Sequence, residues 1–303
     1  CTTCAAGSYA AAGNGNSCTQ VNCANSVDVN GHVYVQAEVT SISSGAFQQC
    51  SALKNVTFAA DSLLTNIDGY AFAQSGLTSI DIPKSVHIIG SHTFSKCLSL
   101  KKLNFSHNSE LRSVGSNAFM GSNISQCMFT PDEKGISNIS NIIDIPPFSF
   151  FGCQNLNSIL INNDNDGNEL KRISSYAFEY SNLKSISFPQ GLHLESIGTY
   201  AFFNLSKLTN IQIPLAVTSI EANAFRDCSS LTSVLFYCTS MANISSSAFV
   251  GTNVSRIDVP VTVNYTGSVE RFEVQFCSPT GHPTGQPSSQ PSSQPSSQPS
   301  SQP

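Results

Sequence analysis

The chain has 303 residues, of which 40% are hydrophobic and 11% charged, with no Trp and a formal net charge of −5. This apolar content is enough for a sizeable core, and Ser, Asn and Thr must cover the surface. The chain has neither the basic run that nucleic-acid binding requires nor an apolar run near the roughly 18 residues of a membrane span. We therefore expect no nucleic-acid partner and no membrane span. The chain does not begin with a signal peptide. We therefore interpret it as a piece of a longer secreted or surface protein.

Residues 1–24 are rich in cysteine, with Cys1, Cys4, Cys18 and Cys23 close together. The segment resembles the end of the small cysteine-rich repeats of ephrin receptors and tumour necrosis factor receptors, which depend on disulfides to fold. We expect Cys4 to pair with Cys18, although four cysteines allow three connectivities, and a partner for Cys1 upstream of this chain stays open. A zinc site is the alternative, which the four-residue spacing of the second pair disfavours.

Residues 25–41 contain one predicted strand. From Gly31 to Val39, strand-forming residues alternate with smaller or polar ones, a pattern typical of a β-strand. An array of repeats needs a cap over its first open coil, and we expect this segment to provide it.

From residue 42 to residue 260 one unit recurs, in which an aliphatic residue is followed five positions later by Phe, usually with Ala just before it. The pairs are Ile42/Phe47, Ile67/Phe72, Ile89/Phe94, Val114/Phe119, Ile145/Phe150, Ile173/Phe178, Ile197/Phe202, Ile220/Phe225 and Ile244/Phe249. Apolar steps of three to five predict a short helical or 3₁₀ turn, and the later steps of two, as in Leu77-x-x-Ile80-x-Ile82, predict a strand. A fixed period of roughly 22 to 31 residues is typical of a solenoid.

The pattern Ile-x-x-x-Ala-Phe-x-x-Cys-x-x-Leu-x-x-Ile-x-Ile-Pro resembles the BspA-like leucine-rich repeat family. The resemblance implies a solenoid of about nine repeats, with short parallel β-strands on the concave face and short helical or 3₁₀ turns on the other side. It also implies adhesion or recognition at a cell surface rather than catalysis. Two departures stand out: the fourth unit runs into an insertion near residues 131–141, and Ser149 replaces the usual Ala.

The cysteines of the repeats differ in kind from those at the N-terminus. Cys50, Cys97, Cys153 and Cys228 occupy one equivalent core position in non-adjacent coils. Coils two apart are separated by roughly 9 to 10 Å, beyond the reach of about 7 Å that a disulfide allows. We therefore expect these four residues to be buried thiols that pack as small hydrophobic side chains.

Three further cysteines lie outside this shared core position. Cys127 takes an inward position in the fourth strand and is expected to be structural. Cys238 and Cys277 fall outside the repeat frame, and we predict that they form a disulfide.

Motifs for chemistry are sparse. Residues 162–169 are similar to the first half of an EF-hand calcium loop, but position twelve of that loop would be Ile173 instead of the required Glu, which favours a turn-rich insertion. The spacing of His87 and His92 does not match a metal pair, and no catalytic set stands out. We predict no metal, no cofactor and no enzymatic activity.

N-glycosylation sequons without Pro are frequent and agree with an extracellular location, given a host with a eukaryotic secretory pathway. They begin at Asn55, Asn104, Asn123, Asn138, Asn204, Asn243, Asn253 and Asn264.

The outward positions of the predicted strands form a ladder that is the candidate binding surface, because side chains alternate along a strand. The ladder consists of Thr57, Asp81, Asn104, Met128, Leu160, Ser187, Gln212, Leu235 and Asp258. Within this face we select Leu160, Leu235, Tyr237, Arg256 and Asp258, because aromatic and Arg residues are common interface anchors. The alternative is that this ladder is exposed only because a solenoid must have some outer face, and a register shift of one residue would bury it.

The C-terminal part leaves the repeat frame. Residues 261–278 include alternating residues from Val269 to Phe276 that predict a closing strand, which we interpret as a C-terminal cap. Residues 279–303 are rich in Pro, Ser and Gln and repeat Pro-Ser-Ser-Gln from residue 287, which predicts a disordered or polyproline II-like segment. This segment resembles the stalks of surface and wall proteins of protists and algae, and an interdomain linker is the alternative.

Together these features favour a non-catalytic, extracellular adhesion or recognition module that binds a protein or glycan partner through the solenoid surface. A structural spacer of a cell wall or extracellular matrix is the alternative, and a carbohydrate-active enzyme is the least favoured reading.

Overall fold

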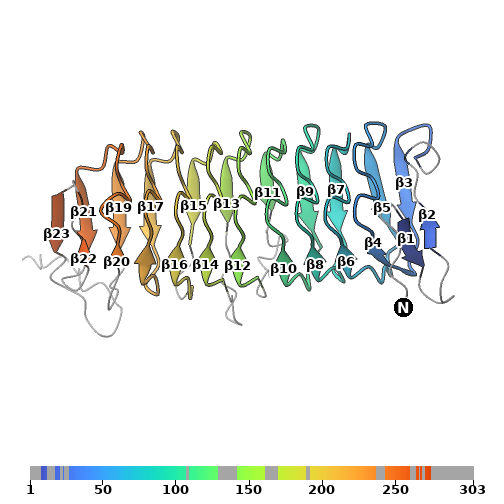
Figure 1. The fold of residues 1–303 in the computed structure, drawn as a ribbon, viewed down its shortest axis with the longest axis horizontal. Coiled ribbons are helices and arrows are strands. Elements are labelled where there is room, and N and C mark those ends of the chain that lie inside the picture. The colour runs from blue at the N-terminus through green and yellow to red at the C-terminus, as the bar shows by residue number, and fades with distance from the viewer. Residues whose placement is uncertain are drawn as a thin grey trace, which may run out of the picture.

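The structure, a computed structural model, describes residues 27–106, 109–128, 142–160, 170–188, 192–236 and 243–259, with short pieces at 8–11, 18–20, 23, 264–265, 267 and 270–273. Over these residues the chain winds into a solenoid whose coils stack side by side along one axis (Figure 1). The predicted domain limits at residues 24, 41, 260 and 278 stay predictions.

Each coil of the solenoid contributes a longer strand to one face, which we call the strand face. These strands are β3 (His32–Val35), β5 (Asn55–Phe58), β7 (Ser79–Ile82), β9 (Lys102–Phe105), β11 (Gln126–Met128), β13 (Ser158–Leu160), β15 (Ser185–Ser187), β17 (Asn210–Ile213), β19 (Ser233–Phe236) and β21 (Arg256–Val259). Within each of three groups, β3 to β11, β13 with β15, and β17 to β21, neighbouring strands pair in parallel with equivalent residues opposite each other, as Ile211 with Val234. The predicted repeat frame therefore gives the observed register.

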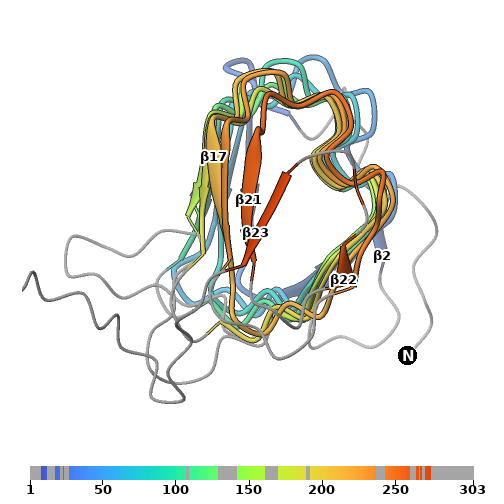
Figure 2. The same cartoon turned by 90° about the vertical axis from the view of Figure 1, so that its left-hand side faces the viewer.

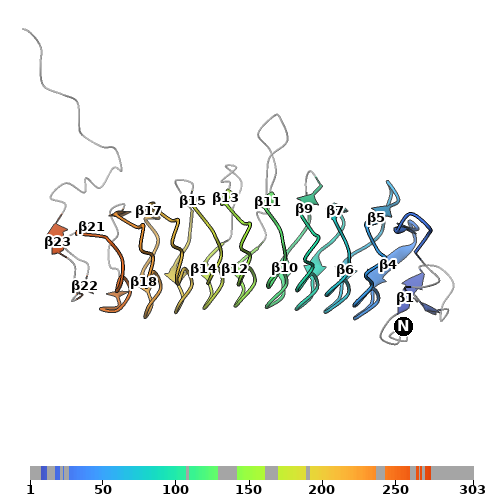
Figure 3. The same ribbon diagram turned by 90° about the horizontal axis from the view of Figure 1, so that it is seen from above.

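A second set of short strands runs along another side of the coils, as the end-on view and the view from above show (Figures 2 and 3). It consists of β4 (Val39–Ile42), β6 (Asn66–Ile67), β8 (Ile88–Ile89), β10 (Ser113–Val114), β12 (Asp144–Ile145), β14 (Arg172–Ile173), β16 (Ser196–Ile197), β18 (Ser219–Ile220), β20 (Asn243–Ile244) and β22 (Asn264–Tyr265). The last residue of most of these strands is the aliphatic that opens the sequence repeat. Most of these aliphatics are buried, whereas Val114 is only partly buried.

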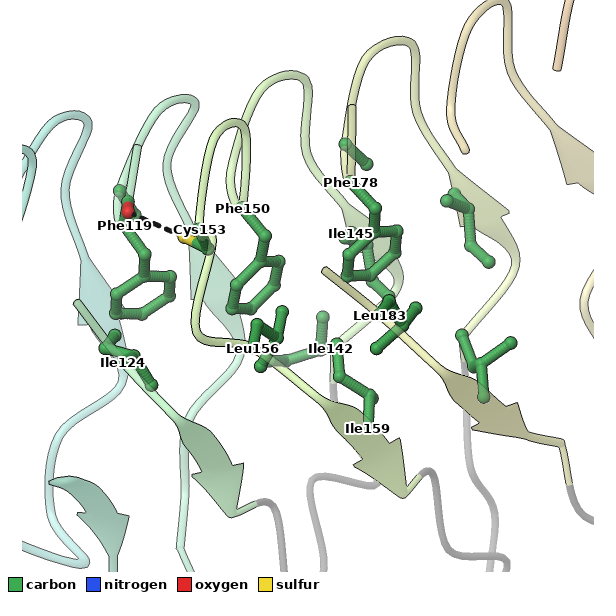
Figure 4. Packing of buried hydrophobic residues seen from close by; sticks show 14 of the residues in the cluster. Phe119, Ile124, Ile142, Ile145, Phe150, Cys153, Leu156, Ile159, Phe178 and Leu183 are labelled. Atoms are coloured by element: carbon green, nitrogen blue, oxygen red, sulfur yellow. Dashed lines mark hydrogen bonds between the residues drawn. The ribbon is translucent and has the colours of Figure 1, made fainter. Parts of the chain in front are cut away.

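The core is a column of stacked Phe rings, one per coil. Phe47, Phe72, Phe94, Phe119, Phe150, Phe178, Phe202, Phe225 and Phe249 are each at most 2% exposed. Successive rings are nearly parallel, with centroids between 5.0 and 5.7 Å apart. Figure 4 shows three of them in a row. The recurrent Phe of the sequence repeat therefore occupies one core position in successive coils, including the coil in which Ser149 replaces Ala.

The turns around these Phe residues are not helical, so the prediction of helical or 3₁₀ turns was wrong for the described repeats. Tyr176 and Tyr180, two residues before and two after Phe178, both adopt positive φ, at 62° and 56°. Neighbouring coils repeat this double left-handed bend, which a helix does not tolerate. The backbone N–H of Phe178 donates to the carbonyl of Ala201 in the next coil, 2.8 Å away. Hydrogen bonds between coils thus replace those within a helix.

Additional strands lie at the two ends of the array. At the N-terminal end, β1 (Ser8–Ala11) pairs antiparallel with β4, and β2 (Cys18–Gln20) pairs antiparallel with β1. At the C-terminal end, β23 (Glu270–Glu273) pairs in parallel with β21. These strands cover the otherwise open edges of the outermost coils, which limits edge-to-edge association.

Candidate functional site

The strand face presents a ladder of outward side chains, in the register that the sequence predicted. Thr57, Asp81, Asn104, Ser187, Gln212 and Leu235 are exposed. Their inward neighbours, such as Val234 and Phe236 on either side of Leu235, are at most 5% exposed. The structure gives the strand positions of Met128, Leu160, Arg256 and Asp258. Tyr237 lies outside the described residues.

The N-terminal half of the strand face combines hydrogen-bonded polar pairs with Tyr34, the register partner of Thr57, which is 52% exposed. His32 Nε2 lies 2.8 Å from Thr57 Oγ1 on the next strand. Asn104 Nδ2 donates to Asp81 Oδ1 over 2.8 Å. These cross-strand pairs already use much of the hydrogen-bonding capacity of their side chains, which leaves less for a partner.

The C-terminal half of the strand face carries an exposed aliphatic side chain. Leu235 is 38% exposed, and its register partners are Gln212 on one side and Asp258 on the other. An apolar side chain with polar neighbours on both sides can pack against a partner while the neighbours set its orientation.

Charged pairs that the sequence analysis missed lie beside the short strands. Arg172 donates to both carboxylate oxygens of Asp144, over 2.8 and 2.7 Å, and the two residues are register partners in β14 and β12. His87 Nε2 lies 3.0 Å from Glu110 Oε2. Both pairs are exposed, so each contributes little to stability. The members are more than twenty residues apart, which only the coil register reveals.

The prediction of a free thiol at Cys50 was wrong, because Cys50 forms a disulfide with Cys23. The distance argument correctly excluded a bond between repeat cysteines, but it did not consider the N-terminal segment. In the first coil no preceding repeat covers this core position, and Cys23 packs there against the core. The expected bonds from Cys4 to Cys18 and from Cys238 to Cys277 involve residues outside the described part of the chain and stay predictions.

The other repeat cysteines are buried free thiols, as predicted. Burial raises the pKa of Cys153 and of Cys228 to about 12 and also raises the pKa of Cys97. Since the thiolate is the reactive form of cysteine, these groups are poor nucleophiles at neutral pH. A catalytic role for them is therefore unsupported.

Six aromatic side chains gather on the turn side of three consecutive coils, and we call them the aromatic patch. They are Phe148, Phe151, Tyr176, Tyr180, Tyr200 and Phe203. Phe148, Tyr176 and Tyr200 stack in a row, with centroid distances of 4.6 and 5.2 Å. The sequence signal was available, because these residues flank the core Phe at fixed offsets in neighbouring units.

Several sequon asparagines reach the surface. Asn55, Asn104, Asn243 and Asn253 are exposed, whereas Asn123 and Asn204 are half-buried. Asn138 lies outside the described residues, and Asn264 is placed in β22. Glycan attachment at all eight positions stays a prediction.

Within the described ranges, no three His, Cys, Asp or Glu side chains are grouped closely enough to hold a metal ion. The segment similar to an EF-hand, residues 162–169, is outside those ranges. Among the described residues there is also no helix with the length and apolar character to cross a membrane.

A family model for the BspA type leucine-rich repeat region, present in six copies, matches residues 23–141 and 143–270. The chain belongs to the BspA-type leucine-rich repeat family. This assignment agrees with the parallel solenoid and the repeat frame. No curated protein matches the chain.

Solved structures of other leucine-rich repeat proteins are similar to this BspA-type chain at low identity. The pneumococcal vaccine antigen PcpA has 19% identity and a TM-score of 0.38, covering 81% of this chain and 80% of its own. A leucine-rich cell surface protein of Faecalibacterium prausnitzii has 20% identity and a TM-score of 0.34, covering 78% and 79%. A leucine-rich repeat protein of Eubacterium ventriosum has 17% identity and a TM-score of 0.40, covering 74% and 83%.

Proposed function

We propose that this BspA-type repeat domain is a non-catalytic extracellular recognition module that binds a protein or glycan partner through the C-terminal half of its strand face. Proteins with BspA-type repeats are typically surface proteins, which supports this location. The disulfide between Cys23 and Cys50 also supports it, because stable disulfides belong to oxidising compartments.

The observation that carries the proposal is the exposure of Leu235 at a strand position whose register partners, Gln212 and Asp258, are polar residues. Its side chain is 38% exposed, although the residues on both sides of it in β19 are buried. Proteins commonly expose single apolar residues, so the position matters more than the exposure. Leu235 is the register partner of Asp258 in β21, the strand that also contains Arg256, so charged residue types occupy the adjacent strand.

The proposal is tested by immobilising the domain and probing it against arrays of extracellular proteins and glycans. The variant Leu235→Glu should abolish binding of any ligand found, because the carboxylate would have to be desolvated in the interface. The double variant Tyr237→Ala, Arg256→Glu should do the same. The control Thr57→Glu changes an exposed ladder residue in the N-terminal half and should retain binding. Circular dichroism of each variant verifies the fold.

Two results contradict the proposal in different ways. If the Leu235→Glu variant retains binding, the binding site lies away from the strand face. Absence of any ligand on both arrays would favour a spacer of a wall or matrix, for which the repeats bind nothing specific.

A further inference from the structure

The boundary between the coil of Phe119 and the coil of Phe150 differs from the others in its sheets. The short strand β10 ends one sheet and β12 begins another, and on the strand face β11 and β13 also belong to different sheets. The strand face is interrupted again between β15 and β17, but the short strands of those two coils, β14 and β16, are paired. Among the described coils, neither set of strands is paired only at the boundary after Phe119.

The sequence explains the gap between β10 and β12. At the following boundary Ser174 N–H donates to the carbonyl oxygen of Ile145 over 2.9 Å, and at the preceding one Gly115 N–H makes the equivalent bond over 2.7 Å. Pro146 occupies this position in the coil between them. Proline has no backbone N–H, so the corresponding bond to the carbonyl of Val114 cannot form.

The core is packed less tightly at this boundary. Val114 is only partly buried and Ile145 is 8% exposed, whereas Ile89 in the preceding coil is fully buried. The ring planes of Phe119 and Phe150 meet at 20°, against at most 10° for the other pairs of the column. The missing sheet bonds therefore coincide with a small change of orientation between the two coils.

The turn side is nevertheless connected across the boundary. Phe119 N–H donates to the carbonyl oxygen of Ser149 over 2.9 Å, and Gly121 N–H donates to that of Phe151 over 2.8 Å. The thiol of Cys153 adds a bond to the carbonyl of Phe119 (Figure 4). Two coils that are bonded along the turns and unpaired along both sets of strands bend most easily about the turns.

We propose that this boundary is a hinge, about which the coils up to Phe119 and the coils from Phe150 onward bend as two units. Paired short strands hold the coils together within each unit. Bending changes the angle between the two halves of the strand face, so a partner on the C-terminal half leaves the N-terminal half free to reorient. The hinge goes beyond the function proposed for the strand face and is tested on the protein alone, so the two proposals fail separately.

The test measures distances between two spin labels by pulsed electron–electron double resonance. The labels are attached to an introduced ketone-bearing amino acid, because the chain already has 11 cysteines. One pair replaces Arg112 and Thr218, and the other replaces Ile143 and Asn243, all of them exposed. Each pair spans four coil steps, about 19 Å along the array. Only the first pair crosses the hinge, so its distance distribution should be about twofold broader than that of the second.

Two matched variants exchange the hinge residue between neighbouring boundaries. Pro146→Ser supplies the missing N–H and should narrow the first distribution to the width of the second. Ser174→Pro removes the same donor one coil later and should broaden the second distribution by about twofold. Equal widths of the two pairs in the native domain, or an unchanged first pair in Pro146→Ser, would overturn the proposal. Circular dichroism verifies that each variant is folded.

Discussion

The thiol of Cys153 donates a hydrogen bond to the carbonyl oxygen of Phe119 in the preceding coil, over 3.1 Å (Figure 4). The same bond joins Cys97 to Phe72 over 3.0 Å and Cys228 to Phe202 over 2.9 Å. These cysteines therefore do more than fill space, since each donates a hydrogen bond that joins two neighbouring coils.

We expect Cys153→Ala to lower the free energy of unfolding by about 1 to 3 kcal/mol, because one hydrogen bond between coils is lost and a small cavity opens. Denaturant unfolding followed by circular dichroism measures the change. A loss under about 0.5 kcal/mol would mean that the thiol is only a space filler.

The serines that contact these cysteines also indicate where a substitution should stabilise the fold. Ser75 and Ser122 each lie 3.6 Å from the thiol of the next coil, at Cys97 and Cys153. Ser181 faces Leu205 at that position, and its hydroxyl is the one buried side-chain oxygen or nitrogen without a partner among the described residues.

Ser181→Ala should therefore raise the free energy of unfolding by about 1 kcal/mol, whereas the matched variant Ser122→Ala should lower it, since only Ser122 has a hydrogen-bond partner. Thermal and denaturant unfolding of the pair provide the measurement. Equal effects of the two substitutions would contradict the assignment.

Removal of the disulfide between Cys23 and Cys50, which are 27 residues apart, should destabilise the domain by about 3 kcal/mol, because the unfolded chain gains freedom. The variant Cys50→Ser tests this by denaturant unfolding, with Cys97→Ser as a control in which no cross-link is lost. Peptide mapping without reduction identifies the bond directly. A linkage of Cys23 to another N-terminal cysteine would contradict the structure.

Glu179 predicts a pH-dependent stability. Its pKa is raised in the folded state, so the folded protein binds this proton more tightly than the unfolded chain does. The stability contributed by the protonated form is complete below the ordinary pKa of about 4 and is lost as pH rises through the raised pKa. Glu179→Gln should accordingly have a higher melting temperature than the native domain at neutral pH and a similar one near pH 4. A difference independent of pH would show that the carboxylate is not desolvated.

The apolar pattern was sufficient to predict the Phe column and the outward register of Thr57 and Leu235, because both follow from fixed spacing within one unit. It could not predict the turns. Steps of three to five residues suit a helix, and only the backbone shows that Tyr176 and Tyr180 adopt left-handed conformations. It also could not predict contacts between units, such as Cys23 with Cys50 or Arg172 with Asp144, because these depend on which coils are neighbours.

The central claim is that one repeat frame, fixed by the Phe column, positions every surface described above. The variant Phe178→Ala tests it most directly, with Phe203→Ala as the matched control in the partly exposed aromatic patch. Phe178 is fully buried between Phe150 and Phe202, so its removal should cost about 3 to 5 kcal/mol of unfolding free energy, several times the cost at Phe203. A loss below about 1 kcal/mol for Phe178→Ala, or equal losses for both variants, would contradict the frame.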